Sequence, residues 1–161
     1  MKYFYLLIIL FLTTLTHAIE KYCQFEEVYS NGDVQIGLLL IKDEKIRYEY
    51  LNQNLYTIIH KDKNSFIVQN DNKKIVQKIN QDMKVLDSLI EILSQYPFIK
   101  ERYYLQDLSI KIEKSKKNFI KRIGIQSNNL NLSINLIDCE DHTIDNIYFN
   151  QFNLTQFKKL S

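Results

Sequence analysis

The chain has 161 residues, and its 21 Lys and Arg against 19 Asp and Glu give a formal net charge of +2. This balance provides no electrostatic case for a nucleic-acid partner or for binding to an acidic membrane surface. Hydrophobic residues make up 45% of the sequence, with 11 Tyr and 9 Phe, which excludes a disordered chain and predicts a domain with a real core.

Residues 1–18 have the pattern of a cleavable signal peptide. Lys2 precedes an apolar run over residues 3–15, and Thr16-His17-Ala18 fits the small-residue pattern before a signal-peptidase cut. The run is shorter than the roughly 20 apolar residues of a membrane-spanning helix, so we expect cleavage after Ala18 rather than a retained anchor. Residues 19–161 are then predicted to form one exported domain.

Most of this domain has the pattern of antiparallel strands, because short runs of β-branched and aromatic residues alternate with polar turns. Asn31-Gly32 is the strongest turn signal, since both residues tolerate a positive φ. Links this short require antiparallel neighbours. The predicted strands are residues 24–29, 34–42, 45–51, 55–61, 65–69, 74–79, 108–113, 119–126, 130–136 and 142–149.

One segment changes to helical spacing, and the fold class is therefore α+β, mainly antiparallel β. Asp82 is a candidate N-cap for a helix over residues 83–96, and Pro97 ends it. One such helix can cover only part of one face of a sheet with so many strands. Residues 36–41 are also apolar on both faces, so they need apolar neighbours on both sides of the sheet. We expect the concave side to be filled either by the sheet curling on itself or by a ligand.

Cys23 and Cys139 are the two cysteines of the chain. An exported chain meets oxidising conditions, so a disulfide between them is the natural interpretation. Two separately buried thiols are the alternative, because the sequence does not show whether their Cα atoms approach within bridging range.

The sequence has no recognisable catalytic motif of the G-x-S-x-G, S-x-x-K or H-E-x-x-H type. We therefore predict no enzyme, no catalytic residue and no cofactor, although scattered residues could still form a site. The cluster from Asp138 to His142 is interpreted as a solvated turn rather than as a metal site.

Arg47 lies in a strand where Ile46, Tyr48 and Tyr50 share one face and Arg47 and Glu49 share the other. In one interpretation, which the spacing favours, Arg47 pairs with Glu49 or solvent on an outer face. In the other, its N–H groups donate to backbone carbonyls and hold a covering element in place.

Several of these segments resemble the LolA-type periplasmic carriers of outer-membrane lipoproteins. The residues that carry the resemblance are Phe25-Glu26-Glu27, the Asn31-Gly32 turn, Gly37 to Ile41, Lys45 to Tyr50, Leu55 to His60, Leu136-Ile137-Asp138 and Thr143 to Phe149. The resemblance implies an unclosed, strongly curved antiparallel β-barrel (a half-barrel) with a helical lid. Arg47 matches the family's arginine latch, which bonds to the lid in the closed state.

The resemblance also implies a function. Such a carrier binds the acyl chains of lipoproteins or lipids in an apolar cavity and shuttles them, without chemistry, from an inner-membrane releasing complex to an outer-membrane acceptor. We expect a monomer. The cavity would be lined by Leu38, Leu40, Ile46, Tyr48, Tyr50 and Ile58 on the strands and by Leu86, Leu89, Ile90 and Leu93 on the lid. The alternative is a disulfide-stapled periplasmic β domain that binds a protein partner or senses the state of the envelope.

Overall fold

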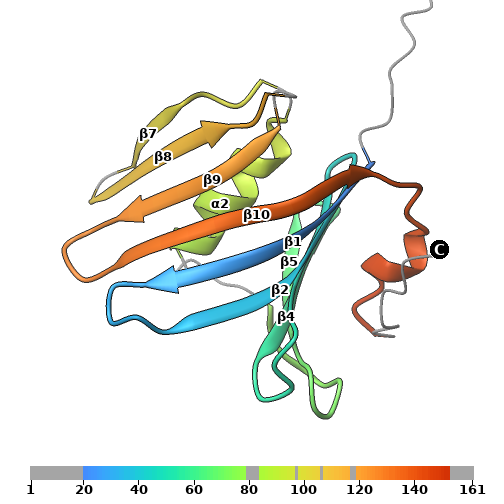
Figure 1. Cartoon of the computed structure of the whole chain (residues 1–161). Helices are drawn as coiled ribbons and strands as arrows, with labels where there is room; N and C mark the ends of the chain where they lie inside the picture. Colours follow the sequence, from blue (N-terminus) through green and yellow to red (C-terminus); the bar gives the residue numbers. More distant parts are fainter. Residues whose placement is uncertain (1–19, 79–83, 97, 106, 117–118, 153–161) are drawn as a thin grey trace, which may run out of the picture.

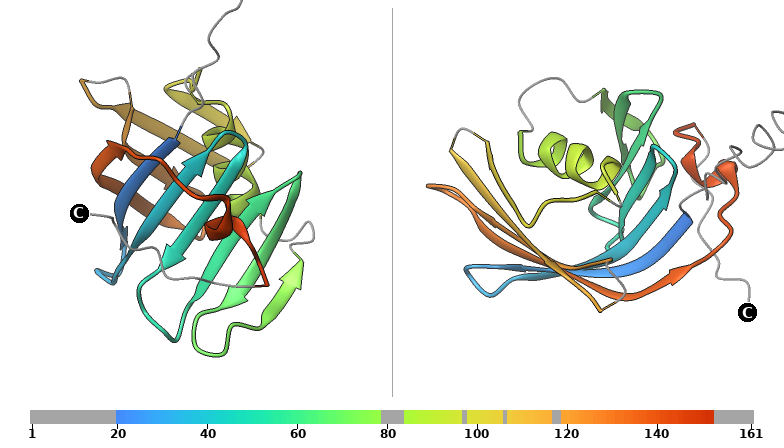
Figure 2. Two further views of the ribbon diagram at one scale, coloured as in Figure 1. Left: turned by 90° about the vertical axis from the view of Figure 1, so that its right-hand side faces the viewer. Right: turned by 90° about the horizontal axis from the view of Figure 1, so that it is seen from above.

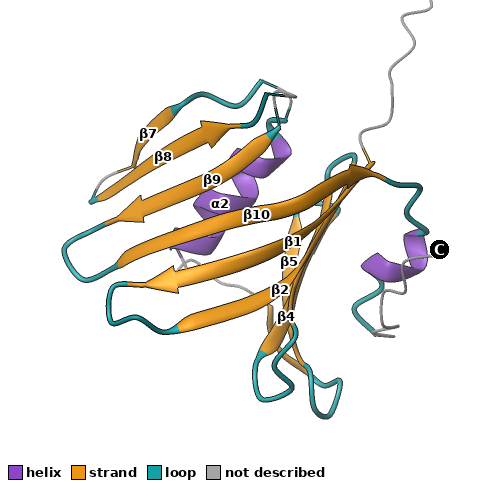
Figure 3. Cartoon of the chain, viewed as in Figure 1, coloured by secondary structure: helices purple, strands orange, loops and turns teal. Residues whose placement is uncertain are grey.

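The computed structural model of the chain describes residues 20–78, 84–96, 98–105, 107–116 and 119–152 (Figure 1). Within these residues the chain is mostly antiparallel β structure, with one α-helix and one short 3-10 helix (Figure 3). The predicted signal peptide lies outside the described residues. No helix of the described part combines the length and the apolar character needed to cross a membrane.

The bounds of the elements follow the predicted strands closely over most of the chain. The strands are β1 (Glu20–Tyr29), β2 (Val34–Lys42), β3 (Lys45–Tyr50), β4 (Tyr56–Lys61), β5 (Asn64–Gln69), β6 (Ile75–Lys78), β7 (Arg102–Leu105), β8 (Leu108–Lys114), β9 (Ile120–Gln126) and β10 (Asn131–Asp141). The helices are α2 (Lys84–Ser94) and the 3-10 helix η1 (Asn146–Phe149).

The ten strands form one sheet in the order β6-β5-β4-β3-β2-β1-β10-β9-β8-β7. Each strand pairs antiparallel with its neighbours, as the short links between consecutive strands require. The β1–β10 pairing joins the two runs of hairpins at the middle of the sheet, while α2 connects β6 to β7. The sheet is not closed, because β6 and β7 are its two edges.

A disulfide joins β1 to β10 and confirms the predicted pairing of the cysteines. The Cα atoms of Cys23 and Cys139 are 4.1 Å apart. The register shifts between Tyr22 and Gln24, and Asp138 has a φ of 50° at this point. One extra residue of β10 is therefore accommodated as a bulge, which brings Cys139 opposite Cys23.

The sheet bends so that α2 lies on its concave side and η1 lies on the other side (Figure 2). Side chains alternate between these faces along each strand. Ile46, Tyr48 and Tyr50 of β3 share one buried cluster with Leu89 and Ile90 of α2. On the outer face, Leu40, Ile59 and Val68 pack with Tyr22, Ile144 and Phe149 in a second cluster.

Two parts of the strand prediction differ from the structure. Residues 142–149 were expected to form a strand, but β10 continues to Asp141 and η1 follows. The side chain of Asp145 caps η1 by accepting from the Ile147 N–H at 2.9 Å, which favours a helical turn over a strand. The short edge strand β7 was not predicted, because four residues carry too little alternation to be recognised.

Candidate functional site

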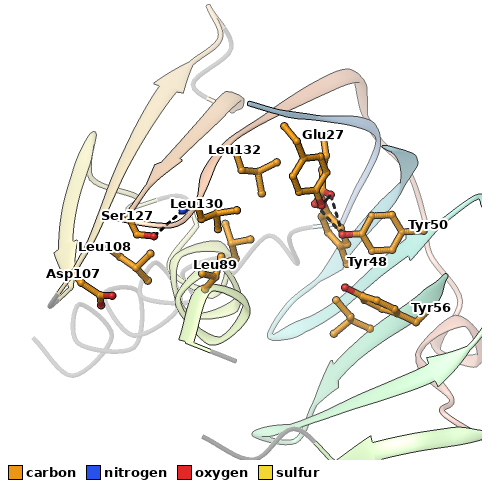
Figure 4. A pocket seen from close by; sticks show the side chains of 13 residues that line it. Glu27, Tyr48, Tyr50, Tyr56, Leu89, Asp107, Leu108, Ser127, Leu130 and Leu132 are labelled. Carbon is orange, nitrogen blue, oxygen red and sulfur yellow. Dashed lines mark hydrogen bonds between the residues drawn. The ribbon is translucent and has the colours of Figure 1, made fainter. Parts of the chain in front are cut away.

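A cavity of about 450 Å³ lies between α2 and the concave face of the sheet, and it is partly open to solvent (Figure 4). Most of the surface that lines it is apolar, because the tyrosines contribute their ring carbons as well. The apolar residues are Ile58, Val85, Leu89, Leu108, Leu130 and Leu132. The polar residues are Glu27, Tyr29, Tyr48, Tyr50 and Tyr56, together with Asp107 and Ser127.

Alternation of side chains along β1 and β3 brings four of the polar residues to the cavity, namely Glu27, Tyr29, Tyr48 and Tyr50. In β1 the inward positions are Cys23, Phe25, Glu27 and Tyr29, so Glu27 occupies a position where its neighbours on the same face are apolar or aromatic. In β3 the inward positions include Tyr48 and Tyr50.

Gly37 of β2 makes room for the aromatic floor beside the cavity. A Cβ atom at this position would overlap the Phe25 ring and the Glu49 backbone carbonyl. Because glycine has no Cβ atom, the Phe25 ring can stack on Tyr48, with the ring centroids 4.0 Å apart. The glycine is therefore needed for close approach of side chain and backbone.

Glu27 is the centre of a buried hydrogen-bond cluster. Its carboxyl group is surrounded by phenols, and the residue is only 3% exposed. Tyr48 donates to Oε1 at 2.6 Å, Tyr29 donates to Oε2 at 2.7 Å, and Tyr50 lies 3.0 and 2.9 Å from the two oxygens. Three donors on one carboxyl group suit a carboxylate, which only accepts hydrogen bonds.

The environment keeps these phenols protonated. Burial raises the pKa of Tyr48 and of Tyr50 well above the usual value of 10.0, and the nearby Glu27 raises both further. Burial and the bond to Glu27 likewise raise the pKa of Tyr29. The tyrosines therefore remain neutral donors and present aromatic faces at any pH near neutrality.

The structure brings together some of the residues that were expected to line a cavity. Tyr48, Tyr50, Ile58 and Leu89 do line it. Others belong to the same buried cluster without lining the cavity, namely Ile46, Ile90 and Leu93. Leu86 is within α2, but its side chain lies outside what the structure describes.

Leu38 and Leu40 lie on the opposite face, which corrects their expected place in the cavity. Leu40 belongs to the outer cluster, and Leu38 packs against that cluster. Leu39 and Ile41 take the inner positions instead. Because this strand is apolar on both faces, the sequence pattern could not decide between two assignments that differ by one residue.

Arg47 also lies on the outer face, away from α2. It is 0% exposed, its Nη1 donates to the Tyr148 carbonyl oxygen at 2.9 Å, and its Nη2 lies 2.8 Å from Oε2 of Glu49. Burial lowers the pKa of Arg47, and the charge of Glu49 opposes that change. The backbone carbonyl that Arg47 contacts belongs to η1, whereas the family resemblance implied a contact with the lid.

We call residues 142–149 the C-terminal segment, and polar contacts fasten it to the outer face. Lys42 donates to the Ile144 carbonyl oxygen and lies 3.0 Å from Glu20, which accepts from the Ile144 N–H. Lys45 donates to Oδ1 of Asn146 at 2.9 Å. Burial raises the pKa of Glu20, but the Ile144 N–H and Lys42 outweigh it, so the net pKa is below 4.5.

Sequence reasoning missed several residues of the cavity. Glu27, Tyr29 and Tyr56 were not singled out, and neither were Leu108, Leu130 and Leu132. A signal for Glu27 was present, because it alternates with Cys23 and Phe25 on the side of β1 that becomes buried. Alternation with polar residues also indicated that Leu130 and Leu132 face the covered side, but their meeting with β1 depends on the long-range β1–β10 pairing.

The residues from Asp138 to His142 are divided between other roles. Cys139 is in the disulfide, and Asp141 pairs with Lys21. Among the described residues, no group of three or more His, Cys, Asp or Glu side chains is arranged to hold a metal ion. The cavity between α2 and the concave face of the sheet is the candidate ligand-binding site.

Compared with known proteins, the chain matches no protein-family model and no curated protein.

Proposed function

We propose that the protein is a periplasmic carrier that binds an acyl chain of a lipoprotein or lipid in the cavity between α2 and the concave face of the sheet. The observation that carries the proposal is a mainly apolar cavity of about 450 Å³ at the place where a packed core would otherwise be. Cavities that bind small ligands typically measure about 300–1,000 Å³. In this proposal the curved sheet is a half-barrel and α2 is its lid.

Elementary energetics favour an alkyl ligand there. Each buried CH₂ group contributes about 0.8 kcal/mol when it leaves water. Leu89 of α2 and Leu108 and Leu132 of the sheet supply apolar surface on different sides of the same space. A chain held only by such contacts is released without breaking a covalent bond, which is what a carrier requires.

The disulfide supports the proposed compartment. Structural disulfides persist in oxidising environments such as the periplasm. Together with the predicted signal peptide, the Cys23–Cys139 bridge is consistent with an exported protein. The partners of such a carrier are an inner-membrane releasing complex and an outer-membrane acceptor.

The test is mass spectrometry of organic extracts from the protein purified from a bacterial envelope, after expression of the full chain with its own leader. We expect co-purified lipid or lipoprotein, and its loss in Leu132→Glu, which places a charge in the cavity. Leu132→Phe, which fills the cavity without a charge, should also reduce the bound lipid. Ile36→Glu is the matched control, because Ile36 is 54% exposed and does not line the cavity.

Protein that carries no lipid, even after incubation with triacylated lipoprotein, would contradict the carrier. It would favour the alternative of a β domain that binds a protein partner or senses envelope state.

A further inference from the structure

The polar end of the cavity indicates which head group the ligand carries, an inference that rests on the proposed alkyl-binding function. A carboxylate has two oxygens with about four acceptor positions. The hydroxyl groups of Tyr29, Tyr48 and Tyr50 donate hydrogen bonds to the carboxylate of Glu27. Because Tyr50 contacts both oxygens, these phenols fill the acceptor positions, and Glu27 presents its charge to the cavity that it lines.

Glu27 differs in its partners from the partly buried acids Glu20 and Glu49. Glu20 lies against Lys42, and Glu49 lies against Arg47. In the part of the chain that the structure describes, no Lys, Arg or His forms an ion pair with Glu27. A carboxylate removed from water without a counter-charge is costly, and phenols compensate it only in part. A cationic group in the cavity would supply the missing charge.

Aromatic rings surround the same space. Tyr29, Tyr48, Tyr50 and Tyr56 all line the cavity. The rings of Tyr48 and Tyr50 have centroids 5.5 Å apart at 76°, and those of Tyr50 and Tyr56 are 5.1 Å apart at 77°. In each pair the edge of one ring meets the face of the next, and a cation within about 6 Å of a ring centroid is attracted to its face.

We propose that the cavity binds an amphiphile with a single alkyl chain and an ammonium head group. The ammonium group lies in the cavity beside Glu27 and against the tyrosine rings that line it. The alkyl chain extends along Leu89, Leu108, Leu130 and Leu132, toward the end of the cavity that Asp107 and Ser127 also line. The tyrosines keep Glu27 oriented, and quaternary ammonium groups are the ligands that aromatic cages typically recognise.

The experiment compares three probes with the same ten-carbon chain and different head groups. The full chain, expressed with its own leader and purified without bound lipid, is titrated with decyltrimethylammonium, decanoate and decyl maltoside below the concentrations at which they form micelles. Calorimetry reports binding, and tyrosine emission reports it independently because the chain contains no Trp. We expect the cation to bind about ten-fold more tightly than the other two.

Two sets of variants locate the head group. Glu27→Gln keeps the size of the side chain but removes its charge, so it should weaken the cation by about ten-fold and leave decyl maltoside unchanged. Tyr56→Phe keeps a ring and should bind the cation like the native chain, whereas Tyr56→Leu should weaken it by about three-fold or more. Circular dichroism checks the fold, and the Tyr56 pair decides the question if Glu27→Gln does not fold.

The outcomes separate the two proposals. A cation preference that disappears in Glu27→Gln, or in Tyr56→Leu but not Tyr56→Phe, supports the ammonium site. Equal or tighter binding of decanoate, unaffected by these variants, overturns the ammonium site and leaves the acyl-chain carrier standing. Binding of none of the three probes overturns both.

Discussion

Buried polar groups have different surroundings on the two faces of the sheet. On the outer face, the guanidinium of Arg47 and the ammonium of Lys42 reach backbone carbonyls of the C-terminal segment and acidic neighbours in the same sheet. On the concave face, the carboxyl group of Glu27 and its phenols border a cavity. The outer face is thus completed by the chain itself, while the concave face leaves room for a ligand.

Burial alone therefore does not identify a binding site. Arg47 is more deeply buried than Glu27, yet its contacts serve to hold η1 on the sheet. Glu27 borders open volume, so its environment changes when a ligand enters. Substitutions on the outer face should therefore change stability, and those on the concave face should change binding.

The largest effect should come from the disulfide that joins β1 to β10. Replacing both cysteines, Cys23→Ser with Cys139→Ser, should lower the free energy of unfolding by about 4 kcal/mol, because the bridge closes a loop of more than 100 residues in the unfolded chain. Urea denaturation of the double variant and of the native protein with reductant measures this change. A loss below about 1 kcal/mol would show that the β1–β10 pairing does not depend on the bridge.

Removing the guanidinium group of Arg47 from the outer face should have the next largest effect. Arg47→Ala should lower the free energy of unfolding by about 3 kcal/mol, because it leaves Glu49 and the Tyr148 carbonyl without their donor. Arg47→Lys keeps the charge but loses the planar fork, so its loss should be smaller. Stability of Arg47→Ala equal to that of the native protein would contradict the role of Arg47 in fastening the C-terminal segment.

Replacing one leucine on each face by a larger residue tests whether the outer face is packed more tightly than the concave face. Leu40 is fully buried in the outer cluster, so Leu40→Phe should cost about 1–3 kcal/mol through overpacking. Leu132 borders the cavity, so Leu132→Phe should cost less than about 1 kcal/mol while it lowers ligand binding. Thermal unfolding and probe titration of both variants measure the two effects. Equal destabilisation would mean that the two faces are packed alike.

The smallest effect concerns pH. The pKa of Glu20 is lower in the folded chain than its usual 4.5, so the stability it contributes is present above about pH 4.5 and is lost as the pH falls through the folded pKa. Because the pair with Lys42 is partly exposed, we expect less than about 1 kcal/mol. Denaturation at pH 7 and pH 3.5 should show a smaller acid-induced loss for Glu20→Gln. An identical loss in both proteins would contradict the contribution of Glu20.

Local patterns predicted much of the sheet. Alternation and turn residues located the hairpins from β1 to β5, and the helical spacing after Asp82 located α2. Residues 142–149 were misassigned because apolar spacing there resembles a strand, whereas the Asp145 cap and packing on the outer face determine a 3-10 helix. The signal peptide stays a prediction.

The candidate site was predictable only in part. Tyr48 and Tyr50 followed from alternation in β3, but the choice of face for β2 did not, since Leu38 to Ile41 are apolar throughout. Leu132 in β10 and Leu130 directly before it reach the cavity because β10 pairs with β1, more than 100 residues earlier in the sequence. Such non-local contacts leave no trace in short windows of sequence.

The central claim is that an alkyl chain enters the cavity between α2 and the concave face. Nuclear magnetic resonance of the isotope-labelled full chain with a spin-labelled C18 fatty acid tests it most directly, because the label broadens signals of nearby protons. We expect loss of the methyl signals of Leu89, Leu108 and Leu132, with those of Leu40, Ile59 and Ile144 preserved. Broadening confined to the outer face, or none at any of these residues, would contradict the account.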